Sequence, residues 1–490
     1  MKMESEPVAC FQRLACIFDP DKSCYEQLRG LSTGPNIVRL LLVSAMTDHF
    51  KAGIRAGVAI LLAFLFLEAN PATDGDLVFE KLERGPRIDQ LIRDLAAGKQ
   101  AALDDFWSRT QREGAPIVEG IAGDPAHKIV TFVWRAESPA KTVMLGAQLT
   151  TARGGTPMVR VGDTDLWFVT YRLRSDLRFV YGFLVDSANG AMGIGRLKPD
   201  PLNRHTPDAK ADPTRSAAGV LAAQSGSELE LPNAPAQPYI LSDAGIAKGA
   251  VEEKQIESAV LETQRRIWVY TPAGYETDRA VGYSVLICFD GGAYRSSLIA
   301  TPTILDNLIA ARKIPPLVAI FIDNPAASRQ EEQANNPKFA NFVAKEVMPW
   351  VHNNWRITSD PRKTILCGFS SGGLSSMFVA YSYPNLFGSV LSQSGAYWRG
   401  FNGDEENFEW LAHEVVKRER LPLHVYLEWG AMETSPAPNN GPSLRDSNRH
   451  LRDVLEAKQY EMKSYEAPGG HDYLSWRATL SDGLMYLLKP

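Results

Sequence analysis

A short apolar run at residues 364–367 leads into the pentapeptide GFSSG (368–372), and a helical pattern follows directly. This G-x-S-x-G spacing is typical of a nucleophile elbow, a sharp strand-to-helix turn that exposes one serine hydroxyl for attack on a carbonyl carbon. Ser370 has glycines at both required positions, whereas Phe369 occupies the position two residues before Ser371. We therefore predict that Ser370 is a nucleophile. A Gly-Ser turn that only closes a strand is the alternative.

A serine hydroxyl becomes a good nucleophile when a base accepts its proton, and α/β-hydrolases place the partners in the chain order serine, acid, histidine. His471 lies in the sequence GGHD, directly after an expected strand, where glycines allow a loop to carry the imidazole toward the elbow. The acid that orients the imidazole should follow an earlier strand, and Glu433 ends such a strand. Asp446 is the alternative acid, and a Ser–His pair without a fixed carboxylate is a further alternative.

The oxyanion that forms during acyl transfer needs two backbone amide donors. One is the amide of Ser371, the residue after the predicted nucleophile, and the other should come from a loop after an earlier strand. The sequence FDGGAY (289–294) fits that loop because its glycines let the backbone turn amides inward. Gly292 or Ala293 is the predicted donor, with a plain turn as the alternative.

These motifs belong to a C-terminal half in which buried strands alternate with helical segments. Strand-like runs lie at 267–275, 283–292, 315–324, 363–373, 386–395, 423–433 and 460–472, with helical patterns such as 339–350 and 444–457 between them. This repetition predicts a doubly wound α/β sheet with functional groups at the carboxyl ends of the strands. We expect the α/β-hydrolase domain to span residues 240–490.

The part before it has a different pattern. One or two short helices are expected between residues 86 and 111. Runs that alternate aromatic or β-branched with polar residues lie at 128–136, 141–149, 165–173 and 176–186. They predict a mostly β, immunoglobulin-like sandwich domain over residues 85–235, with a Pro-rich linker near 230–240. We expect the sandwich to pack beside the Ser370 pocket and to narrow it toward bulky aromatic substrates.

An uncharged apolar stretch, AGVAILLAFLFL (56–67), follows Lys51 and Arg55 and precedes small and polar residues. This is the layout of a secretory signal, and the stretch is shorter than the roughly 20 residues that span a bilayer. We interpret residues 1–72 as a leader with Met46 as a candidate true start; an uncleaved anchor and a buried helix are the alternatives. The leader predicts a periplasmic or secreted protein with no integral membrane domain beyond the leader itself.

The composition argues against several classes of function. The 490 residues include 52 Lys and Arg against 57 Asp and Glu, a net charge of −5, which lacks the basic excess that binds a phosphate backbone. The five cysteines (Cys10, Cys16, Cys24, Cys288 and Cys367) form neither a disulfide framework nor the CxxC spacing of a zinc site. We expect no nucleic-acid partner, no metal and no cofactor.

Taken in order, the motifs resemble those of the enterochelin (ferric-enterobactin) esterase family, within the esterase D type of α/β-hydrolases. The resemblance extends from about residue 100 to residue 490. Its pieces in the C-terminal half are FDGGAY, IPPLVAIFIDN, GFSSGG, LSQSGAYWRG, SNRHLRDVLEAKQYE and GGHDYLSWR, and those in the N-terminal half are DDFWSRTQREGAPIVE, TDLWFVTYRLRSDLRFVYGF and PDPLN. The resemblance implies catalytic roles for Ser370 and His471.

Four residues are candidates for substrate binding. Tyr294 and Arg295 follow Ala293 in the predicted oxyanion loop, and the resemblance adds Trp398 and Arg477. One segment departs from the family pattern of Arg, two residues, Glu-Leu and then Asn: here it reads RQEEQANN (329–336), without the leucine.

The resemblance implies a serine carboxylic-ester hydrolase that works through an acyl-enzyme and cleaves ferric siderophore trilactones to release iron. A secreted esterase acting on feruloyl, acetyl or other aromatic and sugar esters is the alternative. A catalytically inert ligand-binding protein is the alternative of another class. The expected partner is a small-molecule ester, and the family resemblance makes the cytoplasm the alternative to the periplasm or the exterior.

Overall fold

The computed structural model describes residues 78–137, 140–149, 155–186, 197–205, 226–404 and 406–489, all of which fall in a single unit of the chain. The predicted leader (1–72) lies outside these residues. Within the described ranges, no helix combines the length and the apolar character needed to cross a membrane.

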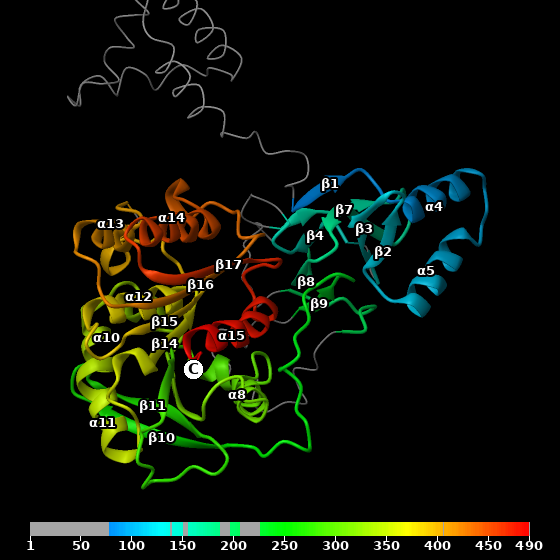
Figure 1. Cartoon of the computed structure of the whole chain (residues 1–490). Helices are drawn as coiled ribbons and strands as arrows, with labels where there is room; N and C mark the ends of the chain where they lie inside the picture. Colours follow the sequence, from blue (N-terminus) through cyan, green and yellow to red (C-terminus); the bar gives the residue numbers. More distant parts are fainter. Residues whose placement is uncertain are drawn as a thin grey trace, which may run out of the picture. The chain divides into compact units, whose positions relative to one another are not determined.

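Two antiparallel sheets form the N-terminal β region (Figure 1). Its strands are β1 (Phe79–Leu82), β2 (Ile117–Ile121), β3 (Asp124–Arg135), β4 (Val143–Gly146), β5 (Thr156–Pro157), β6 (Val159–Arg160), β7 (Leu166–Arg174), β8 (Arg178–Val185) and β9 (Ser227–Glu230). The first sheet has the order β1-β7-β3-β2, with β6 paired to β7, and the second has the order β5-β4-β8-β9. Alternate side chains of the two sheets meet in a shared core, in which the ring centroids of Phe132 and Tyr181 are 4.9 Å apart.

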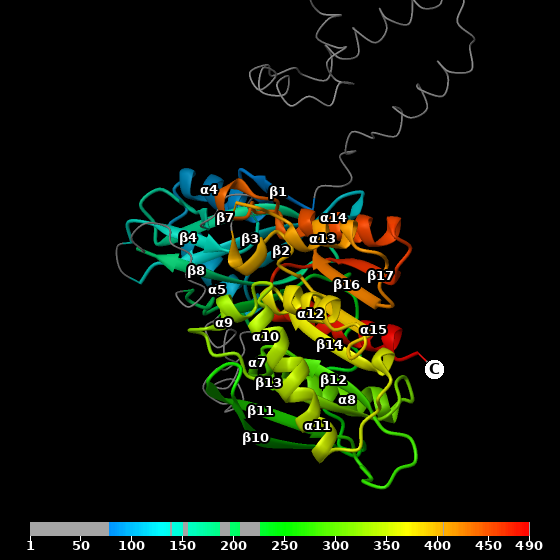
Figure 2. The same cartoon turned by 90° about the vertical axis from the view of Figure 1, so that its left-hand side faces the viewer.

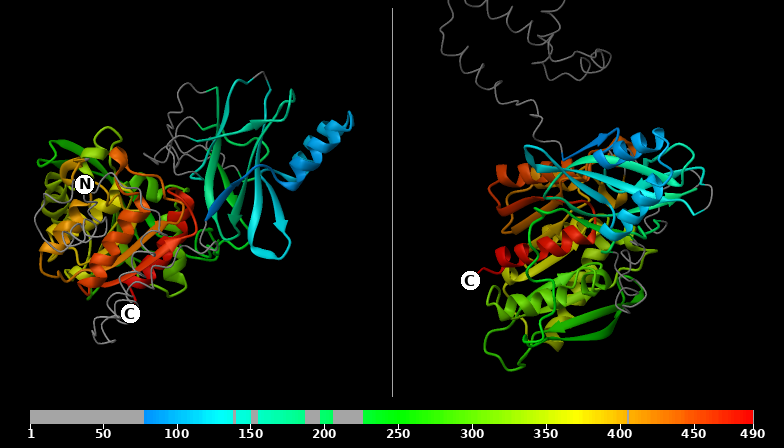
Figure 3. Two further views of the ribbon diagram at one scale, coloured as in Figure 1. Left: turned by 90° about the horizontal axis from the view of Figure 1, so that it is seen from above. Right: turned by 90° about the vertical axis from the view of Figure 1, so that its right-hand side faces the viewer.

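Two helices, α4 (Pro86–Ala96) and α5 (Ala102–Glu113), cover the outer face of the first sheet (Figure 3). Their buried apolar side chains are Ile88, Leu91, Phe106 and Trp107. These pack on Val133, Leu166 and Phe168, which point away from the core between the sheets. The mostly β domain expected ahead of the hydrolase domain is therefore a sandwich with a helical layer on one side.

The C-terminal part is built on one eight-stranded sheet. Its strands are β10 (Ala250–Ser258), β11 (Thr263–Thr271), β12 (Ser284–Cys288), β13 (Leu317–Ile322), β14 (Thr364–Phe369), β15 (Ser389–Gln393), β16 (His424–Gly430) and β17 (Glu461–Ala467). The order is β10-β11-β13-β12-β14-β15-β16-β17; β10 and β11 are antiparallel additions at one edge, and the remaining strands are parallel. Strands β12, β13 and β14 in the middle of the sheet are almost entirely apolar, because helices cover both faces of the sheet.

Helices lie on both faces of this sheet (Figure 2). Their bounds are α7 (Gly291–Arg295), α8 (Thr301–Ala310), α9 (Arg329–Glu332), α10 (Pro337–Phe342), α11 (Met348–Asn354), α12 (Ser371–Ser382), α13 (Trp410–Lys417), α14 (Leu444–Ala457) and α15 (Tyr473–Leu487). A π-helical segment, η7 (Val343–Val347), connects α10 directly to α11, and short 3₁₀ turns are η8 (Pro361–Lys363), η9 (Phe401–Gly403) and η10 (Pro438–Asn440). One core contains α10, α11, α12, α13 and α14, and the opposite core contains α7, α8 and α15.

The winding of the chain reverses between β12 and β14, which are neighbours in the sheet. In such sheets the loops after the strands meet at a crevice beside this reversal. The segments directly after β12, β14, β16 and β17 carry the predicted oxyanion donors, Ser370, Glu433 and His471, in that order. The expected fold class, α/β with a mostly β domain ahead of the hydrolase domain, is confirmed.

Candidate active site

The turn between β14 and α12 holds Ser370 in a strained backbone conformation. Its φ and ψ are 57° and −126°, and a non-glycine residue in such a region costs about 1–3 kcal/mol. Two bonds to the end of β15 hold it: Ser370 N donates to Gln393 O, and Ala396 N donates to Ser370 O, each over 2.9 Å. A Cβ on Gly368 would lie 2.3 Å from the backbone of Gly372, so the turn requires a glycine there. These are the features of a nucleophile elbow.

The imidazole of His471 and the carboxylate of Glu433 are directly hydrogen-bonded. His471 Nδ1 lies 2.7 Å from Glu433 Oε1; the Glu433 side chain is fully buried and that of His471 is 22% exposed. Glu433 Oε2 accepts a bond from Gly430 N at 3.1 Å, within its own loop. The alternative acid, Asp446, accepts instead from Ser443 Oγ in the first turn of α14. The structure therefore brings Glu433, and not Asp446, to the histidine.

A buried indole connects the histidine side of the site with the serine side. The Trp476 ring stacks on Phe369, the residue before Ser370, with centroids 4.1 Å apart and planes 9° from parallel. The same indole meets the His471 ring with centroids 5.1 Å apart. Its Nε1 donates to Ser394 Oγ at 3.0 Å, which fixes the orientation of the ring. In the described part of the chain the Ser370 hydroxyl and the His471 ring are not hydrogen-bonded to each other, so Trp476 is a link between them.

The glycine-rich loop predicted to supply an oxyanion donor forms the short helix α7. It begins after Asp290, whose φ of 55° turns the chain at the end of β12. Ala293 N already donates to Asp290 O at 2.9 Å, which removes this amide as a free donor. The amide of Gly292 lies in the first turn, where N–H groups have no acceptor within the helix. Gly292 therefore remains the candidate donor beside Ser371, which begins α12.

A buried ion pair fixes this loop relative to the elbow. Arg329 Nε and Nη2 donate to the two carboxylate oxygens of Asp290, both over 2.7 Å. The Arg329 guanidinium also lies 5.7 Å from the ring centroid of Phe369. Asp290 N donates to Asn324 Oδ1, and Asn324 Nδ2 donates to Glu332 Oε2. The segment that departs from the expected motif thus supports the loop after β12.

Two polar side chains that the sequence analysis did not predict lie next to the elbow. Arg399 Nη1 donates to Gln330 Oε1 at 2.8 Å and to Ser371 Oγ at 3.3 Å. The Arg399 guanidinium lies 5.8 Å from the ring centroid of Trp398. This brings Trp398, a predicted substrate-binding residue, close to the elbow. The signal for Arg399 is its place in the motif YWRG, directly after Trp398.

Tyr294 and Arg295, two other predicted substrate-binding residues, have surroundings that differ from those of Trp398. Tyr294 is fully buried beneath the elbow, where its hydroxyl donates to Gln393 Oε1 at 2.9 Å. Arg295 lies over the indole of Trp268, 4.7 Å from the ring centroid. The contacts of Tyr294 are those of a core residue, because the ring packs on Phe369 from the covered side of the sheet.

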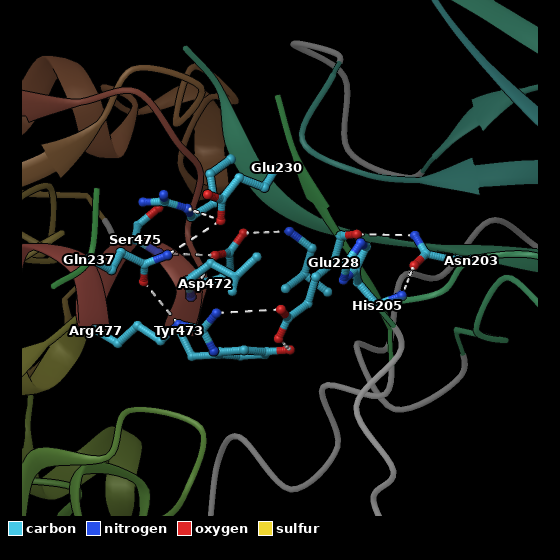
Figure 4. Close-up of polar contacts among 12 residues, drawn as sticks. Asn203, His205, Glu228, Glu230, Gln237, Asp472, Tyr473, Ser475 and Arg477 are labelled. Atoms are coloured by element: carbon cyan, nitrogen blue, oxygen red, sulfur yellow. Dashed lines mark hydrogen bonds and ion pairs between the residues drawn. The ribbon is translucent and has the colours of Figure 1, made fainter. Parts of the chain in front are cut away.

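Arg477, the fourth predicted substrate-binding residue, contacts the N-terminal β region and the linker (Figure 4). Its Nε donates to Gln237 Oε1 at 3.0 Å, and its Nη2 lies 3.4 Å from Glu228 Oε2. The guanidinium also lies 5.7 Å from the ring centroid of Tyr473. These contacts are those of a residue that joins α15 to β9 and the linker.

Two further carboxyl groups are buried near the site. Asp472 accepts a backbone bond from Val180 at 3.0 Å and others from the first turn of α15, and burial raises its pKa to about 6. Glu428, on β16, is fully buried, and its oxygens find no hydrogen-bond partner among the described residues. Burial, followed by the charge of Glu433, raises the pKa of Glu428 well above its usual range. The described residues contain no cluster of His, Cys, Asp and Glu side chains suited to a metal ion.

Both halves of the chain match known protein families. A family model described as "Putative esterase" matches residues 258–487, and one described as "Enterochelin esterase, N-terminal" matches residues 129–240. An iron(III) enterobactin esterase of Escherichia coli O6:H1 (strain CFT073) is 31% identical over 343 residues, covering 68% of this chain and 82% of the relative. The chain belongs to the enterochelin esterase family.

Other members of the enterochelin esterase family cover more of the chain. An iron(III) salmochelin esterase of the same Escherichia coli strain is 27% identical over 423 residues, covering 81% of this chain and 96% of the relative. The enterobactin esterase of Shigella flexneri, crystallised in the presence of enterobactin, is 25% identical with a TM-score of 0.62, over 78% of this chain and 98% of that protein. The expected family is confirmed, and the chain is a carboxylic ester hydrolase.

One fully buried position of this enterochelin esterase family member carries a polar side chain. Gln333 stands where the motif has leucine. It is fully buried, and its amide oxygen and nitrogen find no partner among the described residues. Its Nε2 lies 3.7 Å from the place that a Cβ on Gly372 would take, directly behind the elbow. A buried polar group left without a partner costs about 1–3 kcal/mol, which a leucine would not incur.

Proposed function

We propose that this chain hydrolyses the ester bonds of a ferric siderophore trilactone through an acyl-enzyme on Ser370. The observation that carries the proposal is the strained elbow at Ser370, together with the Glu433–His471 hydrogen bond on the loops after two nearby parallel strands. The choice of substrate is supported by the relatives, whose names give iron(III) enterobactin and iron(III) salmochelin.

The proton transfers in this proposal run through His471. Because Glu433 engages Nδ1, Nε2 is the nitrogen left to accept the serine proton. Ser370 Oγ attacks the ester carbonyl carbon, Nε2 takes the hydroxyl proton, and the carbonyl electron pair moves to oxygen. Glu433 holds the imidazole in the required tautomer and stabilises the imidazolium. In this proposal the hydrogen bond between Ser370 Oγ and His471 Nε2 forms when substrate is bound, because catalytic hydrogen bonds in such sites often reach their final geometry only in the complex.

The negative oxygen of the tetrahedral intermediate would face the amides of Ser371 and Gly292. The strained elbow fixes the first amide, and the Asp290–Arg329 ion pair fixes the loop of the second. Donors that are in place before the reaction need no reorganisation, and one such donor contributes about 100- to 1,000-fold in kcat.

Collapse of the intermediate completes the acylation half of the cycle. The C–O bond of the lactone breaks, and the leaving alkoxide takes the proton from His471, which opens the ring and leaves the acyl group on Ser370. A water molecule then attacks the acyl carbon while His471 Nε2 accepts a proton from it. The serine leaves with that proton, and a carboxylic acid is released.

A substrate panel with matched serine variants tests the proposal. The panel contains a ferric catecholate trilactone, its iron-free form, methyl ferulate and p-nitrophenyl acetate. We expect the trilactones to have the highest kcat/KM and Ser370→Ala to lose about 10⁴- to 10⁶-fold in rate. Ser382→Ala, at the far end of α12, is the control, because its hydroxyl donates to Phe378 O within the same helix.

Two outcomes would contradict the proposal. Rates close to those of the unmodified protein in Ser370→Ala, with an unchanged circular dichroism spectrum, would remove Ser370 as the nucleophile. A higher kcat/KM for methyl ferulate than for either trilactone would contradict the proposed substrate, although it would still agree with the proposed esterase chemistry.

A further inference from the structure

The loop that carries His471 is held by a side chain of the N-terminal β region. Gln148, just after β4, accepts at Oε1 a hydrogen bond from His471 N over 2.7 Å, across 323 positions of sequence. Its amide lies directly against Gly470, where a Cβ would come within 2.9 Å of Oε1. Gln148 therefore reaches the histidine backbone because residue 470 has no side chain.

Strand β8 contacts the same loop on both sides of His471. Arg178 N donates to Pro468 O at 3.0 Å, and Arg178 forms an isolated parallel bridge with Gly469. Val180 N donates to Asp472 Oδ2 at 3.0 Å. The residues before and after the histidine are thus tied to one strand of the N-terminal β region.

The loop of Glu433 is held from the same side. Ala431 and Met432, which precede it, are buried in the core of the N-terminal β region. Met432 N also donates to Gly469 O at 3.0 Å, which connects the acid loop to the histidine loop. Both members of the Glu433–His471 pair therefore lie on loops that pack against the N-terminal β region.

A polar cluster extends this contact along the start of α15 (Figure 4). Tyr473 Oη donates to Glu228 Oε1 at 3.0 Å, beside the Arg477 contacts to Glu228 and Gln237. Figure 4 shows these side chains of α15 facing residues of β9 and of the linker. The helix that follows the histidine is thus joined to β9 and the linker at its first turns.

We infer that Gln148 is a positioning residue for His471, so that the N-terminal β region takes part in catalysis by placing the base. The inference rests on the proposed function. A displacement of about 1 Å in a catalytic group costs on the order of 100-fold in rate. Gln148 supplies the acceptor for the His471 amide itself, so its loss releases the backbone of the base directly.

The test uses the full chain and a small ester, so that the measured rate depends on the catalytic groups and not on the binding of a large substrate. Gln148→Leu removes the acceptor at similar volume. With p-nitrophenyl acetate we expect kcat to fall about 10- to 100-fold while KM changes little, because only the alignment of the base is altered. Labelling of the serine by a fluorophosphonate probe should slow by the same factor, since it depends on the same base.

Two further variants separate positioning from general damage. Gln90→Leu changes an exposed glutamine on α4 that is bonded to Asp94 and Arg93, far in sequence from the contacts with the histidine loop, and its kcat should stay close to that of the unmodified protein. Gln148→Glu keeps an acceptor and should restore kcat. Its negative charge should also move the acidic limb of the kcat/KM profile to higher pH, because it stabilises the imidazolium.

Each outcome decides the inference. Unchanged kcat and labelling rate in Gln148→Leu would overturn it, and so would an equal loss in Gln90→Leu. Failure of the unmodified protein to hydrolyse the ester or to react with the probe would instead contradict the proposed function. If Gln148→Leu does not fold, Gly470→Ala replaces it: the added methyl displaces the Gln148 amide, and an unchanged kcat there would overturn the inference.

Discussion

The imidazole of His471 stands edge-on to the indole of Trp476, at an interplanar angle of 88°. The indole cannot turn freely, because one face is stacked on Phe369 and its Nε1 is bonded to Ser394. The orientation of His471, the proposed base, is therefore coupled to Phe369, the residue before the proposed nucleophile. This coupling leads to the first prediction.

Trp476→Phe should lower kcat by about 2- to 10-fold, because an aromatic pair is worth roughly 0.5–1.5 kcal/mol and the smaller ring gives up the edge contact. The phenyl ring can still stack on Phe369, so the fold should persist. Steady-state kinetics with p-nitrophenyl acetate measure the effect, and Trp350→Phe on α11 is the control. Equal kinetics in Trp476→Phe and the unmodified protein would show that the contact with His471 has no part in the reaction.

Glu433→Gln should reduce kcat by about 10⁴-fold, because the amide no longer holds the imidazole in the tautomer that accepts the serine proton. Asp446→Asn changes a carboxylate of similar chemistry in the first turn of α14 and should leave kcat nearly unchanged. Single-turnover measurements with a chromogenic ester distinguish the two variants. The reverse order of effects would transfer the role of the acid to Asp446.

Arg329→Met should destabilise the protein by about 3–5 kcal/mol, because it leaves the Asp290 carboxylate buried without its partner. The control is Arg266→Met, which removes a more exposed pair with Asp323 and should cost less than about 1 kcal/mol. Denaturant unfolding monitored by tryptophan fluorescence measures both free energies. Similar values for the two variants would argue that the buried pair does not hold the oxyanion loop.

Glu428→Gln should stabilise the protein increasingly as the pH rises. Burial raises the pKa of Glu428, so the folded chain holds a proton that the unfolded chain has lost. Its contribution to stability is complete below the ordinary carboxyl pKa of about 4.3, and it falls by roughly 1.4 kcal/mol per pH unit as the pH rises from there toward the folded pKa. The Tm difference from the unmodified protein should therefore grow as the pH rises above about 4.3 and level off only once the pH passes the folded pKa. Glu419→Gln, on the surface, is the control.

Gln333→Leu should raise the free energy of unfolding by about 1–3 kcal/mol, since it removes a buried amide without a partner among the described residues. Leucine also restores the residue that the family motif has at this position. Urea unfolding of the two proteins measures the difference. A loss of stability would indicate that the amide is bonded in solution to a group outside the described residues or to water.

The sequence predicts those parts of the fold and site that have a local signature. The apolar runs of β12, β13 and β14 identify a covered parallel sheet, and the elbow around Ser370 and the glycines before His471 mark two loops at its edge. Strand β10 is missed because it lies at the exposed edge of the sheet, where its sequence AVEEKQIES is largely charged and polar.

Contacts between distant residues leave no such signature. Gln148 and Trp476 contact His471 only in the folded chain, and the residues next to them in the sequence do not indicate these contacts. Tyr294 illustrates the opposite problem: it lies in a recognisable motif, yet the motif does not tell which side of the loop its ring faces. The spacing of residue types along the sequence predicts the helices, strands and loops, whereas the direction in which each side chain points depends on packing in the folded protein.

The separation of 323 positions between Gln148 and His471 has a consequence for the timing of synthesis. The N-terminal β region leaves the ribosome first, and at roughly 5–20 residues per second about 15–60 s pass before its partner loop is made. Ser370 emerges during that interval with neither Glu433 nor His471 yet in the chain. A nascent or prematurely terminated chain that ends between residues 370 and 470 therefore carries the proposed nucleophile without the proposed base, and under this proposal hydrolysis starts only when synthesis is nearly complete.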